Sequence, residues 1–151
     1  MSFNNVTSRP TTIIELTNSS DQSISAGDAL LFDTLRASGA HGVSVDVSGN
    51  ISLDTSKEYY IQASFDVVRG TTSDSWAFDF YNATTSTILA PSDGAFQAQW
   101  DAVTTSARTN ATFTAAYVQS SPLSSIVLKA TTMSSAGTVS TNTHIIIIEV
   151  S

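Results

Sequence analysis

The chain contains no cysteine among its 151 residues and only six lysines and arginines. Without cysteine, disulfide frameworks, thiolate metal sites and cysteine nucleophiles are all excluded. The six cations are scattered from Arg9 to Lys129 among thirteen carboxylates, so they cannot form a basic phosphate-binding stripe. The net charge of −7 opposes binding to other polyanions. We therefore expect no direct contact with nucleic acid and no adhesion to a membrane.

A signal peptide and long apolar runs are also missing. Met1 to Thr7 lacks the basic start and apolar run of a signal peptide, and no apolar stretch is long enough to span a bilayer. Helical periodicity is weak, because its one candidate, Ala98 to Arg108, has a Thr-Thr-Ser centre. We therefore expect a β-protein that is made soluble in a cytoplasm.

Serine and threonine dominate the composition, with 25 and 21 residues, alongside 7 Phe, 4 Tyr and 2 Trp. This composition favours strands. The longest apolar run alternates: Tyr59, Ile61, Ala63, Phe65 and Val67 share one face, which we predict to be core.

Strand-like runs separated by Gly, Pro, Asn, Asp and Ser follow one another along the whole chain. They predict an all-β jelly-roll sandwich of about eight to ten antiparallel strands. The expected strands are 10–17, 28–35, 42–53 with a hairpin turn at 48–50, 57–68, 74–81, 85–89, 95–100, 111–119, 124–133 and 143–150.

The last strand is apolar on both faces. Ile145 and Ile147 occupy one face and Ile146 and Ile148 the other. In an antiparallel sandwich one face meets the opposite sheet and the other normally meets water, so the second face predicts a cover by another copy of the chain. The pattern leaves open which pair faces inward; we place Ile146 and Ile148 at the subunit contact.

Three tyrosines fall on predicted outward faces of other strands. Tyr is enriched at subunit interfaces, so we predict that Tyr60 and Tyr117 contribute to the same contact, with Tyr81 as a further candidate.

Catalytic motifs are scarce. His41 lies in a predicted loop and His144 opens the last strand, but nothing pairs either with a nucleophile, and no Gly-x-Ser-x-Gly elbow occurs. The Asp46 to Asn50 segment carries oxygen ligands of the kind calcium prefers without the fuller spacing of a calcium loop, so we interpret it as a turn. We expect no enzyme, no cofactor and no metal site.

Carboxylates near tryptophan are the remaining chemical candidates. Asp74 and Asp79 flank Trp76, and Asp93 and Asp101 bracket the second tryptophan. An acid pair beside aromatic side chains can serve a glycosidase or sugar-binding site. We favour the simpler interpretation, in which these aspartates solvate loops and form turns.

Three stretches resemble the tumour necrosis factor and complement C1q superfamily of trimeric jelly rolls, over about residues 20–151. They are Ser25 to Phe32, with its Gly-Asp turn; Gly49 to Leu53 followed by Glu58 to Phe65; and Ser125 to Lys129 with the terminal 145–150 segment. Glu58, where the family usually has Gly, and Ser121 to Leu123, in place of a late Gly-Asp turn, depart from the pattern. The resemblance implies a threefold homotrimer packed through the sheet that contains the terminal strand.

The organisation suggests a structural protein. We expect residues 1–18 to form an N-terminal arm and first strand region, and residues 19–151 to form the jelly-roll domain. Ser/Thr-rich, Lys-poor β-proteins of this sort resemble phage virion proteins. We therefore predict a trimeric decoration or cement protein on the capsid exterior, made in the host cytoplasm. It would bind the major capsid protein through arm residues Phe3, Val6, Arg9 and Pro10.

Two other functions stay open. The chain could be the receptor-binding tip of a phage tail fibre or spike, recognising host glycans. A small glycan-active enzyme is a third possibility if an acid pair such as Asp74 and Asp79 proves close and buried.

Overall fold

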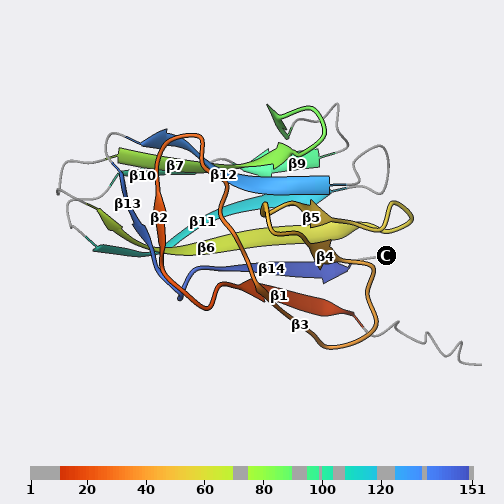
Figure 1. The fold of residues 1–151 in the computed structure, drawn as a ribbon. Helices are drawn as coiled ribbons and strands as arrows, with labels where there is room; N and C mark the ends of the chain where they lie inside the picture. Colours follow the sequence, from red (N-terminus) through yellow and green to blue (C-terminus); the bar gives the residue numbers. More distant parts are fainter. Residues whose placement is uncertain are drawn as a thin grey trace, which may run out of the picture.

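The computed structural model describes residues 11–69, 75–89, 95–98, 100–103, 108–118, 125–133 and 136–149. Within these ranges all regular secondary structure is β-strand. The strands form two antiparallel sheets, here named sheet A and sheet B (Figure 1). The predicted all-β jelly-roll sandwich is therefore confirmed. No helix in the described ranges has the length and apolar character needed to cross a membrane.

Within the described residues sheet A holds eight strands, and its continuous order is β2-β13-β6-β14-β1-β3, with β11 on the other edge of β6 and β9 beyond it. The first described strand and the last thus lie side by side in one sheet, next to the terminal strand β3 (Figure 1). The strands of sheet A are β1 (Ile13–Thr17), β2 (Gln22–Ile24), β3 (Thr34–Ala37), β6 (Tyr59–Arg69), β9 (Ala95–Ala98), β11 (Arg108–Val118), β13 (Gly137–Val139) and β14 (His144–Glu149).

In the part of the chain that the structure describes, sheet B holds six strands in the order β10-β7-β12-β5-β4, with β8 also paired to β7. They are β4 (Ser44–Val45), β5 (Ile51–Ser52), β7 (Ser75–Asn82), β8 (Thr87–Ile88), β10 (Trp100–Val103) and β12 (Ser125–Met133). The segment 98–108, which was the one candidate for a helix in the sequence, contains β10. The described residues of this segment are therefore strand, as expected.

The core lies between the sheets and follows the predicted alternation of β6. All five side chains of its predicted core face are buried, and Phe65 stacks on Phe78 of β7 with ring centroids 4.3 Å apart. Burying a large apolar side chain contributes about 1.5–3 kcal/mol, so this face of β6 is a main source of stability. The two sheets are joined through these contacts.

The predicted hairpin at 48–50 is present between β4 and β5. Gly49 takes a φ of 81°, a left-handed conformation that L side chains rarely adopt. The carboxylate of Asp46 accepts hydrogen bonds from the backbone N–H groups of Ser48 and Asn50 and from the Asn50 side-chain amide. Each Asp46 oxygen therefore has a donor within the turn, and the turn interpretation of this segment is confirmed.

The predicted single strand at 28–35 is wrong. Ala29 forms an isolated bridge to Lys129 in sheet B, whereas Thr34 begins β3 in sheet A, so the chain crosses between the sheets. At the crossing, the side chain of Gln22 replaces a neighbouring strand: its Nε2 donates to the Leu31 carbonyl (2.9 Å) and its Oε1 accepts from the Leu31 N–H (2.8 Å). A side-chain amide can satisfy both backbone groups of a residue, so a strand is not required here.

Candidate subunit interface on the outer face of sheet A

Strand β14 resolves which isoleucines face the core. Ile145 and Ile147 are fully buried between the sheets, whereas Ile146 and Ile148 are half-buried on the outer face of sheet A. The pair that we placed at a subunit contact is therefore the pair that points away from the core.

Ile148 belongs to a row of apolar positions that crosses sheet A. It lies opposite Ile13 of β1 on one side and Tyr60 of β6 on the other. Ile13 is 47% exposed and Tyr60 is 37% exposed. Residues opposite one another in a sheet share a face, so these side chains are neighbours on the outer surface. We name Ile13, Tyr60, Ile146 and Ile148 the apolar patch.

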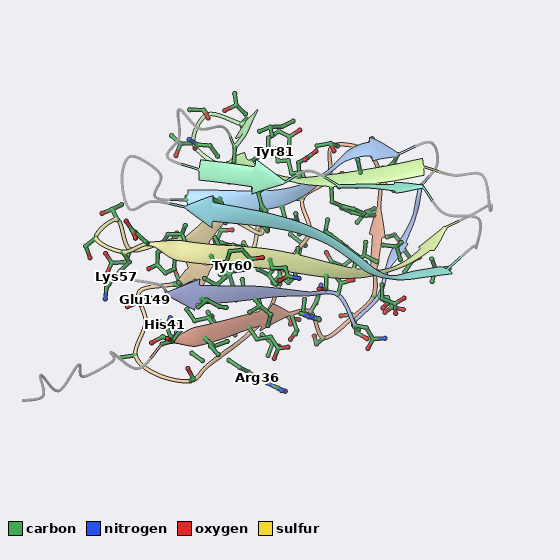
Figure 2. All side chains as sticks on the ribbon, turned by 180° about the vertical axis from the view of Figure 1, so that it is seen from behind. Arg36, His41, Lys57, Tyr60, Tyr81 and Glu149 are labelled. Atoms are coloured by element: carbon green, nitrogen blue, oxygen red, sulfur yellow. The ribbon has the colours of Figure 1, made fainter. Side chains whose placement is uncertain are left out.

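The backbone register extends the row to two further strands. Tyr117 of β11 lies opposite Tyr60, and Phe96 of β9 lies opposite Tyr117. The side chains of β9 and β11 lie outside the described part of the structure. The register nevertheless brings the positions of Tyr60 and Tyr117, which the sequence predicted for one interface, together. Figure 2 shows Tyr60 on β6, between β11 and β14.

Polar residues flank the patch. Ile146 lies between Glu15 and Gln62, and in the next outward-facing row His144 lies between Thr17 and Ser64. Among the described residues, the apolar side chains of the outer face therefore gather at one end, apart from Val68 of β6, which is 39% exposed near the other end.

An ion pair lies at the same end of the sheet as the apolar patch. Lys57 Nζ lies 2.7 Å from Glu149 Oε1, and both side chains are partly exposed. Figure 2 shows the two residues together at one end of the sheet. The Glu149 N–H also donates to the Thr12 carbonyl (3.0 Å), which fixes the chain just before β1. The ion pair ties the start of β6 to the end of β14.

The opposite end of the outer face is covered by the turn before β14. Asp66 of β6 is buried there, and its Oδ2 accepts from the Ser140 hydroxyl (2.6 Å) and the Asn142 amide (3.0 Å). The Asp66 N–H donates to the Thr143 hydroxyl (2.9 Å). Sequence reasoning missed this network, because Asp66 looked like an outward residue and its partners lie more than seventy positions further along the chain.

The two histidines are bonded to nearby backbone. His41 Nδ1 accepts from the Val43 N–H (3.2 Å), and His144 Nδ1 lies 3.2 Å from the Asn142 carbonyl oxygen. The described residues contain no group of three or more His, Cys, Asp or Glu side chains placed to hold a metal ion.

The interpretation of Asp79 as a solvated loop residue is wrong. Asp79 lies within β7, is fully buried and accepts from the Thr131 hydroxyl (2.6 Å). Burial, together with the negative charge of Asp79, raises the pKa of neighbouring Tyr81. Lys129 Nζ lies 5.2 Å from the Tyr81 ring centroid, a cation–π distance. Tyr81 therefore lies on sheet B, apart from Tyr60.

The other candidate residues are only partly placed. Asp101 lies on β10, with its backbone opposite Ala77. Asp74 and Asp93 lie outside the described residues, as do the predicted arm residues Phe3, Val6, Arg9 and Pro10.

Comparison with known proteins supports the fold. No protein-family model and no curated protein matches the chain. Among solved structures, it is similar to the Eiger TNF of S. frugiperda, with a TM-score of 0.60 over 95% of this chain and 94% of that one. The identity is 11%, so the similarity concerns the fold alone. It confirms the predicted TNF-like jelly roll.

Proposed function

We propose that the chain forms a homotrimer through the apolar patch and acts as a structural virion protein that decorates a phage capsid. The observation that carries the proposal is the patch itself: half-exposed Ile13, Tyr60, Ile146 and Ile148 on the outer face of a TNF-like jelly roll. When a partner covers apolar side chains that are gathered on one exposed face, the free energy of the system falls, and this favours association.

The surroundings of the patch support a protein–protein contact. Stable interfaces combine an apolar or aromatic centre with a polar rim. Here Glu15 and Gln62 flank Ile146, and the Lys57–Glu149 ion pair lies at the end of the sheet. A second copy is the simplest partner, because every copy presents the same face.

The capsid role rests on composition and on the N-terminal arm. A Ser/Thr-rich, Lys-poor β-protein resembles virion proteins, and residues 1–10 supply the apolar side chains of Met1, Phe3, Val6 and Pro10 and the cation Arg9, with no carboxylate. We propose that this arm binds the major capsid protein while the jelly roll forms the trimer.

Cosedimentation with capsids tests this role. The capsids are assembled from a candidate major capsid protein of the same genome, and the variant lacks residues 1–10. It keeps Thr12, whose carbonyl bonds Glu149, so sheet A stays intact. We expect the full chain to cosediment and the variant to remain a soluble trimer that does not.

Two results would contradict the assignment. Unchanged cosedimentation of the shortened chain would remove the arm from the contact. Absence of capsid binding by the full chain, together with specific binding on a glycan array, would support the receptor-binding alternative instead.

A further inference from the structure

A groove of about 580 Å³ opens between the loop after β1, the crossing segment before β3, and the β4 end of sheet B. Its volume lies in the range of about 300–1,000 Å³ that is usual for binding clefts. Its lining includes the apolar side chains of Leu31, Val45 and Val47 and the carboxylates of Asp21, Asp33 and Asp46, here named the rim carboxylates. We name this feature the acidic groove.

Two of the apolar lining residues are accessible to solvent. Val47 is 95% exposed and Leu31 is 42% exposed. Neither side chain is needed for the core, because the buried core residues of this region are Leu30 and Phe32. Exposed apolar surface inside a groove favours a ligand with an aliphatic part.

Hydrogen bonds hold the rim carboxylates in place. Asp33 accepts from the Ser19 hydroxyl (2.5 Å), the Ser19 N–H (3.0 Å) and the Thr34 hydroxyl (3.0 Å), and Asp46 accepts from the Asn50 side-chain amide (2.9 Å) and from backbone N–H groups of its own turn. These hydrogen bonds lower the pKa of Asp33 and of Asp46. Asp21 accepts from the Thr141 N–H (3.0 Å).

The described residues that line the groove include no lysine or arginine. The three rim charges are therefore uncompensated within it, and charge complementarity requires a cationic occupant. A metal ion is a poor candidate, since the described residues contain no side-chain group placed to hold one.

We infer that the acidic groove docks an extended basic segment of a protein partner. The aliphatic stem of a lysine or arginine lies on Leu31 and Val47, and its cationic head lies among the rim carboxylates. The backbone N–H and C=O of Leu31 are already bonded to Gln22, so the groove recognises side chains rather than adding a strand there. The inference does not depend on the trimer.

Fluorescence anisotropy with three labelled decapeptides tests the inference. One alternates Lys and Leu, one alternates Glu and Leu, and one alternates Lys and Ser. We expect the Lys–Leu peptide to bind most tightly, the Lys–Ser peptide to bind more weakly and the Glu–Leu peptide not to bind. Because the rim is exposed to solvent, we expect binding to weaken as NaCl rises from about 50 mM to about 500 mM.

Variants locate the binding site. Asp33→Asn and Asp46→Asn keep a hydrogen-bond acceptor while removing the charge, and each should weaken Lys–Leu binding about two- to fivefold. The matched control is Asp54→Asn, because Asp54 braces an exposed turn in the same way outside the groove. Val47→Ser should weaken binding without affecting the fold, and Ile88→Ser on β8 controls for it.

Three results would overturn the inference. The first is equal weakening by Asp54→Asn, which would indicate general charge attraction. The second is equal binding of the Lys–Leu and Lys–Ser peptides, which would show that the apolar lining residues do not contribute to binding. The third is undiminished binding by a folded variant that combines Asp33→Asn, Asp46→Asn and Val47→Ser.

Discussion

Individual aspartates in this chain serve two structural roles. Asp46 is exposed and Asp54 is partly exposed, and each accepts hydrogen bonds from the turn that immediately follows it. Asp66 and Asp79 are buried and bond to hydroxyls from distant segments. The first role could be predicted from local sequence, because Asp caps turns. The second could not, because burial of a strand residue on an outward face depends on loops that return from elsewhere.

The brace at Asp46 can be tested by titration. The hydrogen bonds from Asn50 are the main cause of its lowered pKa. Asn50→Ala removes the side-chain donor, so we expect the pKa of Asp46 to rise toward its ordinary value in an NMR titration. The pKa of Asp54, whose partner is Ser56, should not change. A fixed Asp46 pKa in the variant would contradict this account.

The same lowered pKa values set the direction of the pH dependence. A carboxyl group with a lower pKa in the folded state stabilises the fold above its unfolded pKa, and the effect is lost as pH falls through the folded value. For Asp33, Asp46 and Asp54 we therefore expect constant stability at neutral pH and a decline below about pH 4, measured by urea unfolding. A decline that begins near pH 7 would point to other groups.

Two glycines with left-handed φ provide a matched pair. A Cβ on Gly49 would collide with the Leu30 carbonyl oxygen, whereas a Cβ on Gly27 would meet nothing within 4 Å. We expect Gly49→Ala to lower the free energy of unfolding by at least about 2 kcal/mol and Gly27→Ala by about 1 kcal/mol. Equal losses in chemical denaturation would show that the collision is relieved by small shifts.

At the scale of elements, alternation along a strand was the strongest sequence signal. It gave the core face of β6 correctly and showed that β14 is apolar on both faces. It could not show which pair of isoleucines in β14 faces inward, because four consecutive isoleucines make both faces of the strand equally apolar. It also failed at 28–35, where Leu30 and Phe32 are buried although the chain changes sheet between them and β3. The three-residue strands β2 and β13 were too short to predict.

The inward pair of β14 should contribute to the stability of the fold through burial in the core. Ile147 is fully buried, so Ile147→Ala should lower the free energy of unfolding by about 3 kcal/mol through lost burial and a cavity. Ile88→Ala removes the same atoms from an exposed position on β8 and should cost less than about 1 kcal/mol. Similar losses for both variants in urea unfolding would contradict the assigned orientation of β14.

For the whole molecule, the two ends of the outer face of sheet A differ in kind. One end is closed by the Asp66 network, and the other presents Ile13, Tyr60 and Ile148 to solvent. The exposed apolar side chains are the reason why we propose that copies associate through this end.

A substitution in the patch should separate assembly from folding. Ile148→Asp places a charge among Ile13 and Tyr60, where water can solvate it in a monomer but not in an assembly. We expect a folded monomer, whereas Ile88→Asp on sheet B should leave the assembly unchanged. Circular dichroism confirms that each variant is folded before its mass is measured.

Sedimentation equilibrium of the unmodified chain beside Ile148→Asp tests the central claim most directly. The chain mass is 15.9 kDa, and we predict a species of three times that mass for the unmodified chain and of one chain mass for the variant. A monomeric unmodified chain, or a trimer that the substitution leaves intact, would contradict the assignment of the apolar patch as the subunit interface.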